Sequence, residues 1–139
     1  MSTDDVVEEI LSTFDTITVV GASANSAKPA NEVPAYMQAF GWRIVPVNPT
    51  AQTIVGEKVY PTIADVAEQV GFIDVFRPAA DAPEIARQAV AAGASALWLQ
   101  LGIVSPQARQ IAQDAGLLYV EDRCLKIEQR RTGITPTRS

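Results

Sequence analysis

The chain has 139 residues, of which 47% are hydrophobic and 19% are charged, and this composition is typical of one soluble globular domain. Its formal net charge of −5 argues against nucleic acid as a partner, because binding a phosphate backbone requires a concentrated basic face. No apolar run approaches the roughly 18 residues that a membrane helix needs, so no membrane span is expected.

The amino-terminal segment predicts a helix followed by a strand. Ser2 and Asp5 have the spacing of a capping box, and apolar residues recur on one helical face as far as Phe14. Residues 1–15 are therefore expected to form an N-terminal helical segment. The first strand is expected at 16–20, where the chain is continuously apolar or β-branched.

A long polar loop at 22–31 separates this strand from the next helix. The helix is expected to start near Glu32, because Pro34 is tolerated in a first helical turn. Gly41 is placed to end it.

Strands and helices alternate through the rest of the chain. Further strands are expected at 43–47, 72–76, 96–99 and 117–120. Helices are expected to begin at capping or proline signals and to end at glycines, over 62–69, 81–93, 105–116 and 124–131. Residues 132–139 are expected to be a frayed tail.

Five apolar strands that alternate with helices predict an α/β fold with a doubly wound, mainly parallel sheet and helices on both faces. The whole chain, 1–139, is expected to be one domain. Trp98 is expected in the core, because the helices cover both faces of such a sheet.

The chain contains no histidine and only one cysteine. The absence of histidine removes histidine-dependent triads, general bases, metal ligands and phosphohistidine chemistry, so no catalytic residues and no metal site are expected. A lone cysteine cannot form an internal disulfide, and together with the acidic amino terminus it favours a cytoplasmic location.

The turns that follow the predicted strands carry glycine or polar residues, and in a parallel sheet such turns gather along one edge. Gly21 follows the first strand and precedes a helix, which offers backbone N–H groups and a helix N-terminus to a phosphate. Asn48, Arg77 and Gly102 follow the next three strands. The pattern predicts a nucleotide-like ligand at this edge.

The pattern departs from that of NAD-binding proteins in two places. Their fingerprint reads G-x-G-x-x-G after the first strand, whereas this chain supplies only Gly21. They also place a carboxylate after the second strand to hold the ribose, whereas this chain has Asn48 and no acidic residue until Glu57. Both departures weaken an NAD(P) assignment and leave room for a ribose that carries a phosphate.

Six short motifs together resemble the small, stand-alone CoA-binding proteins of Rossmann-like fold. They occur in order at compatible spacing: V-V-G-A-S at 19–23, P-V-N-P at 46–49, G-E-K-V-Y-P-T at 56–62, D-V-F-R at 74–77, W-L-Q-L-G at 98–102 and D-R-C-L-K-I-E at 122–128. That family is similar to the CoA-binding domain of the succinyl-CoA synthetase alpha subunit, whose chemistry depends on a phosphorylated histidine in a second domain. The resemblance implies CoA binding without that chemistry.

The resemblance implies that Gly21, Ala22 and Ser23 approach the CoA phosphates, with the Ser23 hydroxyl donating a hydrogen bond. Lys28, in the loop that follows, can meet a phosphate as a mobile charge. Two alternatives stay open: Gly21 serves a tight turn that needs no ligand, and Lys28 is a solvated loop lysine.

Asn48 and Pro49 match the family's turn after the second strand, where the adenosine end of CoA is expected. The alternative is that Asn-Pro simply forms a turn. Arg77, at the next strand end, can pair with a phosphate while Phe76 covers the adenine face. The alternative for Arg77 is a surface ion pair.

Gln100 and Gly102 follow the fourth strand, where the amide can orient the pantetheine arm and the glycine can admit it. Cys124 follows the fifth strand, and its sulfur is expected near the thiol end of CoA, with Arg123 and Lys126 favouring the thiolate. The alternative for Cys124 is an inert, buried cysteine.

The predicted function is non-catalytic binding of coenzyme A or an acyl-CoA at the carboxyl edge of the sheet, with a small molecule as the ligand and no nucleic-acid or membrane partner. Two alternatives remain. One is an NAD(P)-linked oxidoreductase, and the other is a subunit that lends CoA binding to a partner ligase or acyltransferase.

Overall fold

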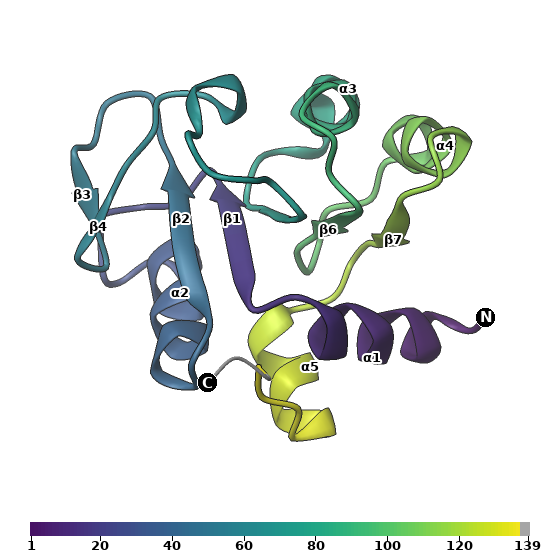
Figure 1. Cartoon of the computed structure of the whole chain (residues 1–139), viewed down its shortest axis with the longest axis horizontal. Coiled ribbons are helices and arrows are strands. Elements are labelled where there is room, and N and C mark those ends of the chain that lie inside the picture. Colours follow the sequence, from purple (N-terminus) through teal and green to yellow (C-terminus); the bar gives the residue numbers. More distant parts are fainter. Residues whose placement is uncertain (137–139) are drawn as a thin grey trace.

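A five-stranded parallel sheet forms the centre of the computed structural model, which describes residues 1–136 (Figure 1). Its strands are β1 (Thr16–Val20), β2 (Arg43–Val47), β5 (Phe72–Val75), β6 (Ala96–Leu99) and β7 (Leu118–Val120). They lie in the order β2-β1-β5-β6-β7, and every neighbouring pair is parallel. The strand order therefore reverses between β1 and β5. The predicted doubly wound α/β fold is confirmed.

Helices cover both faces of this sheet (Figure 1). One face carries α1 (Thr3–Thr13), α2 (Pro29–Ala39) and α5 (Leu125–Thr132), and the other carries α3 (Ala82–Ala91) and α4 (Pro106–Asp114). The shorter elements are an antiparallel pair, β3 (Thr53–Ile54) with β4 (Glu57–Lys58), and the single 3-10 turns η1 (Ile63–Asp65) and η2 (Ala79–Asp81).

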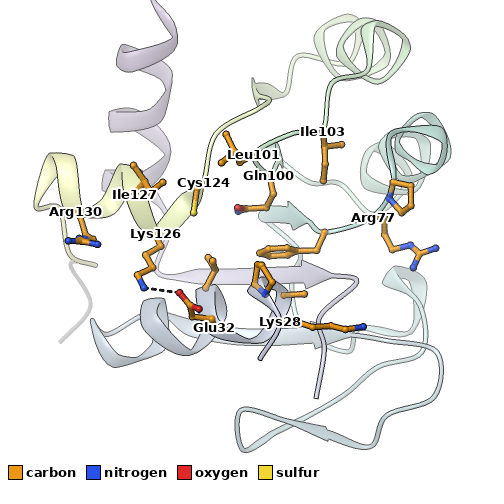
Figure 2. A pocket seen from close by; sticks show the side chains of 15 residues that line it. Lys28, Glu32, Arg77, Gln100, Leu101, Ile103, Cys124, Lys126, Ile127 and Arg130 are labelled. Atoms are coloured by element: carbon orange, nitrogen blue, oxygen red, sulfur yellow. Dashed lines mark hydrogen bonds and ion pairs between the residues drawn. The ribbon is translucent and has the colours of Figure 1, made fainter. Parts of the chain in front are cut away.

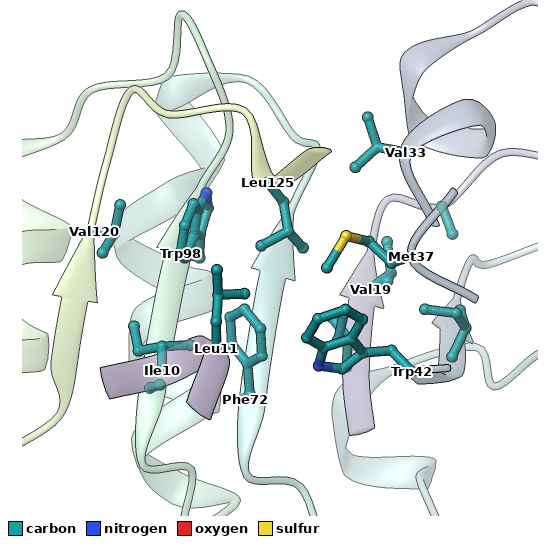
Figure 3. Close-up of a cluster of buried hydrophobic side chains, with 14 of the residues drawn as sticks. Ile10, Leu11, Val19, Val33, Met37, Trp42, Phe72, Trp98, Val120 and Leu125 are labelled. Carbon is teal, nitrogen blue, oxygen red and sulfur yellow. The ribbon is translucent and has the colours of Figure 1, made fainter. Parts of the chain in front are cut away.

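The aromatic part of the core lies beneath α1, α2 and α5 (Figure 3). Trp98 and Phe72 are fully buried there, with ring centroids 6.0 Å apart, and Trp42 belongs to the same cluster. The Trp98 indole N–H donates to the Arg123 carbonyl at 2.8 Å, which satisfies the only polar atom of that side chain. The expected burial of Trp98 is confirmed. Beneath α3 and α4 the core consists mainly of alanine and aliphatic side chains.

Local sequence signals account for the helix starts at α1 and α4. The Ser2 hydroxyl accepts from the Asp5 N–H at 3.1 Å, and the Asp5 carboxylate accepts from the Ser2 N–H at 3.1 Å, which completes the predicted capping box. Ser105 caps α4 by accepting from the Ala108 N–H at 3.0 Å, with Pro106 at the first helical position.

Three expected boundaries were wrong. Helix α2 begins at Pro29 rather than near Glu32, because Pro29 occupies the first helical position and Pro34 falls inside the helix. The helix expected over 62–69 is only the turn η1, since Val66 leaves the helical region and packs against the core in irregular chain. The expected frayed tail starts too early, because α5 continues to Thr132.

The segment after α5 is held to that helix by a side chain. The Gln129 amide donates to the Ile134 carbonyl at 3.0 Å, and Ile134 packs against the core. The rest of the predicted tail, 137–139, lies outside the described residues.

The described residues contain neither a membrane-spanning helix nor a cluster of metal-ligating side chains. No helix in residues 1–136 is both long and apolar enough to cross a membrane. Within the same range, no group of histidine, cysteine or carboxylate side chains is arranged to hold a metal ion.

Candidate ligand-binding site

The turns after β1 and β5 touch at the point where the strand order reverses. Gly21 has a φ of +84°, which favours glycine, and a Cβ added there would lie 2.6 Å from the Phe76 carbonyl oxygen and 2.9 Å from the Arg77 Cδ. The Gly21 N–H donates to the Val47 carbonyl at 3.1 Å, which also draws in the end of β2. Glycine is thus required here by the fold, independently of any ligand.

The loop after Gly21 is tied to helix α2 through a carbonyl that Pro34 leaves free. A proline at this position has no N–H for the Ala30 carbonyl four residues earlier. That carbonyl instead accepts from the Ser23 N–H at 3.1 Å, and the Asn31 amide donates to the Ser23 carbonyl at 2.8 Å. The mid-helix proline, which misled the sequence-based boundary, therefore positions Ser23 beside the start of α2.

Asn48 joins the turn after β2 to the turn after β1. Its side-chain Nδ2 donates to the Ala22 carbonyl at 2.9 Å, while its Oδ1 accepts from the N–H groups of Thr50 and Ala51, each at 2.9 Å. The bonds from Thr50 and Ala51 agree with the alternative in which Asn48 and Pro49 simply form a turn. The same bonds fix the position of Ala22 at the edge of the sheet.

Two cavities open along this edge. The first, of about 660 Å³, is called the polar cavity here because backbone turns and polar side chains line it, including Gly21, Ser23, Asn48, Thr62 and Asp81. The second, of about 670 Å³, is called the apolar cavity because aliphatic side chains form much of its wall, including Val33, Leu101, Ile103 and Ile127. Four residues line both cavities: Lys28, Ala30, Phe76 and Arg77. The two cavities therefore meet.

The junction between the cavities carries two basic side chains in different states. Arg77 donates to the Asp81 carboxylate at 2.9 Å, and because its side chain is 51% exposed this is a surface ion pair of small energetic value. The Lys28 ammonium group has no hydrogen-bond or ion-pair partner within residues 1–136. The ion-pair alternative thus describes Arg77, while the Lys28 ammonium is available to an anion.

Backbone and hydroxyl donors add to the junction. The Ser23 hydroxyl accepts from the Asn25 N–H at 3.0 Å and has no acceptor for its own proton in the described part of the chain. The Ala30 N–H, in the first turn of α2, likewise has no acceptor among the described residues. A helix N-terminus favours negative charge, so these donors and Lys28 can receive a phosphate together.

Gln100 and Cys124 project into the apolar cavity from its inner wall (Figure 2). Cys124 is partly exposed, which contradicts the full burial expected in the alternative for this residue. On the outer side, Lys126 pairs with Glu32 at 2.9 Å. Arg130 lies at the end of the cavity away from Lys28 and Arg77, and no ion-pair partner for it is found within the described range (Figure 2).

A buried carboxyl group lies behind the Gln100 amide. Asp74, on β5, is fully buried; its Oδ1 accepts from the Gln100 Nε2 at 2.6 Å, and its Oδ2 has no partner among the described residues. Burial raises the pKa of Asp74 from 3.8 to about 7, against the lowering effect of the Gln100 hydrogen bond. Gln100 in turn accepts from the Leu125 N–H at 3.4 Å. The pair thus links β5, β6 and the start of α5 beneath the cavity.

The structure brings ten of the eleven predicted ligand residues to the two cavities. The polar cavity is lined by Gly21, Ala22, Ser23, Asn48 and Pro49, the apolar cavity by Gln100 and Cys124, and both by Lys28, Phe76 and Arg77. Gly102 lines neither of them. Its φ is +86°, and its N–H donates to the Asp122 carboxylate at 2.8 Å, so it serves the turn after β6.

Some residues act differently from the sequence-based expectation, and others were missed. Arg123 does not line the apolar cavity, because it pairs with Asp4 and Glu128 at 2.9 and 3.0 Å. Asp74 was missed as a partner of Gln100, although an acidic residue inside an apolar strand is a signal for a buried carboxyl group. Arg130 was missed because the sequence places only the start of the last helix, at Cys124, beside the ligand and does not show which face of the following turn lines the cavity.

Comparison with known proteins gives consistent matches over most of the chain. A model of the CoA binding domain family matches residues 15–130. The uncharacterized protein YneT of Bacillus subtilis is 30% identical over 121 residues, which cover 87% of this chain and 90% of YneT. A solved structure from Thermus thermophilus has a TM-score of 0.87 and 34% identity, covering 94% of this chain and 98% of that chain.

A larger enzyme matches part of the chain. The ADP-forming acetate–CoA ligase II of Archaeoglobus fulgidus is 34% identical over 71 residues, which are 50% of this chain but only 10% of the ligase. The shared region is therefore a small part of that enzyme.

Proposed function

The chain belongs to the CoA-binding domain family, and from this premise we propose that it binds coenzyme A or an acyl-CoA along the two joined cavities without catalysing a reaction. The observation that carries the proposal is the junction: four residues line both cavities, so one elongated ligand can occupy both. CoA is such a ligand, with a charged nucleotide at one end and a flexible pantetheine arm at the other.

The character of the two cavities supports one direction for the ligand. The adenosine end is assigned to the polar cavity, and the phosphates are assigned to the junction, where Lys28, Ser23 and the start of α2 offer free donors. The pantetheine arm then extends along the apolar cavity and brings its thiol toward Cys124.

The NAD(P) alternative has less support at the same edge. The turn after β2 carries no carboxylate for a free ribose diol, and the Asn48 amide at that position is already bonded to Ala22, Thr50 and Ala51. A ribose whose 3′ position carries a phosphate, as in CoA, does not need that carboxylate.

A second candidate function is that of a subunit that lends CoA binding to a partner ligase. The partial match to the acetate–CoA ligase favours it, because in that relative the matched region is a small portion of an enzyme. Both candidates require CoA binding by this chain, so they share the first experiment. Co-purification with a ligase subunit is what separates them.

The first experiment is calorimetric titration of ligand-free protein with CoA, acetyl-CoA, dephospho-CoA and NAD in parallel. We expect CoA and acetyl-CoA to bind, dephospho-CoA to bind more weakly for want of the 3′-phosphate, and NAD not to bind. NAD binding as tightly as CoA would overturn the assignment.

Cys124 provides an independent test of the site, because it is the only cysteine in the chain. Alkylation by a maleimide is followed by intact-mass spectrometry with and without saturating acetyl-CoA, which has no free thiol to react. We expect acetyl-CoA to slow the alkylation of Cys124 at least about tenfold and NAD at the same concentration to leave it unchanged. Binding of acetyl-CoA without protection would place the thiol end elsewhere.

The non-catalytic part of the proposal has its own assay. Purified protein is incubated with acetyl-CoA while free thiol is measured, and no release above spontaneous hydrolysis is expected. Turnover that disappears when Cys124 or Arg77 is substituted would contradict it.

We also propose a cytoplasmic location for the protein, which cell fractionation tests.

A further inference from the structure

Two large hydrophobic side chains that remain exposed to solvent form the outer wall of the apolar cavity. Leu101, in the turn after β6, is 63% exposed, and Ile127, on α5, is 52% exposed. Both line the cavity, and Figure 2 shows them on the same side of it with Cys124 between them in this view. Two separate elements thus place exposed hydrocarbon beside the only thiol of the chain.

Apart from Arg130, at the far end of the cavity, the polar side chains near this wall are already engaged. Gln100 donates to Asp74 at 2.6 Å and accepts from the Leu125 N–H at 3.4 Å. The Lys126 ammonium pairs with Glu32 at 2.9 Å and lies 5.2 Å from the centroid of a tyrosine ring. A ligand group that extends past Cys124 along this wall therefore meets mainly hydrocarbon.

We propose that Leu101 and Ile127 bind the hydrocarbon chain of an acyl-CoA, so that the preferred ligand is a thioester with a medium-length acyl group. This inference rests on the proposed function, because it requires the thioester sulfur to lie near Cys124. An acyl chain fits these observations better than a protein partner, because the two side chains border the cavity of about 670 Å³ that is proposed to hold the pantetheine arm of CoA.

The test compares dissociation constants for CoA, acetyl-CoA, hexanoyl-CoA and octanoyl-CoA by calorimetry. A fully buried methylene contributes about a fourfold gain in affinity, so four additional methylenes against a half-open wall are expected to tighten binding at least about tenfold. Hexanoyl-CoA is therefore expected to bind at least about tenfold more tightly than acetyl-CoA.

Substitution of the two wall residues tests whether the dependence of affinity on acyl-chain length arises there. In Leu101→Ser and Ile127→Ser the ratio of hexanoyl-CoA to acetyl-CoA affinity is expected to fall below about threefold. Both positions are exposed, so folding is expected to tolerate the change. Val104→Ser is the matched control: Val104 is 47% exposed in the loop before α4 but lines neither cavity, and it is expected to keep the wild-type ratio.

The outcomes separate this inference from the proposed function. If CoA itself does not bind, the proposed function fails. If CoA binds but affinity is independent of chain length, the proposed function stands and the acyl inference is overturned, which leaves the apolar wall to a protein contact. A chain-length effect that survives both wall substitutions also overturns it.

Discussion

The polar and apolar cavities meet at the same residues but are built in different ways. The polar cavity depends on backbone constraints: the positive φ of Gly21, the Ala30 carbonyl that Pro34 frees for Ser23, and the Asn48 bonds to Ala22. The apolar cavity depends on side chains that extend from its walls, such as Leu101 and Cys124. Substitutions around the polar cavity are therefore expected to damage the fold, whereas those around the apolar cavity change the ligand that fits.

The largest effect is expected from Gly21→Ala. The left-handed backbone costs a non-glycine residue about 1–2 kcal/mol, and overlap of its Cβ with the Phe76 carbonyl adds about 1–3 kcal/mol, for a total loss of about 2–5 kcal/mol in the free energy of unfolding. Gly102→Ala is the matched control. Its φ is +86° but nothing lies within 4 Å of its added Cβ, so only the smaller conformational cost is expected. Urea denaturation measures both.

Equal losses in the two glycine variants would contradict the account of the polar cavity. The contact between the turns after β1 and β5 would then contribute nothing beyond backbone conformation. The glycine requirement at position 21 would reduce to a tight turn, as in the alternative that the sequence left open.

How much of this arrangement could be predicted depends on the range of the interaction. The strands at 16–20, 43–47 and 96–99 have the expected bounds, because apolar runs and turn residues delimit them locally. Parallel strands also bring their carboxyl-end turns to one edge, so the convergence of Gly21 and Arg77 followed from the fold class.

The remaining features depend on register and on contacts between distant segments. Asp74 stands beside β6 because the two strands pair in one register, which sequence alone does not give, and Gln100 reaches it only through that pairing. The start of α2 was misplaced because Pro34 is tolerated inside the helix by a bond from Ser23. The availability of Lys28 and Arg130 also depends on where acidic side chains lie in space.

Beneath the apolar cavity, Asp74→Asn is expected to change the pH dependence of stability. The pKa of Asp74 is raised from 3.8 to about 7, so the folded state holds the proton more tightly than the unfolded state. The stabilisation that comes from the bound proton is complete below about pH 4 and is lost as the pH rises through 7. Between pH 4 and pH 8 the unfolding free energy of the wild type is therefore expected to fall by about 2–4 kcal/mol relative to that of Asp74→Asn, whose amide does not titrate.

Denaturant unfolding of both proteins across this pH range measures the difference. If the two stability profiles run parallel between pH 4 and pH 8, Asp74 does not titrate in this window. The unpartnered Oδ2 atom would then need another source of stabilisation for its charge.

At the junction, Arg77→Ala is expected to weaken CoA binding by about 1.5–3 kcal/mol, the usual range for a hydrogen bond to a charged group. Its stability cost is small, because its ion pair with Asp81 is exposed. Arg87→Ala is the matched control, since Arg87 is likewise exposed and paired with a carboxylate, that of Glu84, but lines neither cavity. Unchanged CoA affinity in Arg77→Ala would mean that Arg77 does not contact the ligand and only forms its surface ion pair.

The smallest effect tests the direction of the ligand. Lys28 and Arg130 have no ion-pair partner among residues 1–136 and lie toward opposite ends of the apolar cavity (Figure 2). With the phosphates at the junction, Lys28→Gln is expected to weaken CoA binding by about 1 kcal/mol, the upper range for an exposed charge pair, and to reduce the salt dependence of affinity. Arg130→Gln is expected to change affinity less than about twofold, because only the thiol end approaches it. Calorimetry at two salt concentrations measures both variants. The reverse ranking would place a phosphate beside α5, so that CoA runs in the opposite direction and its adenosine lies against the apolar wall.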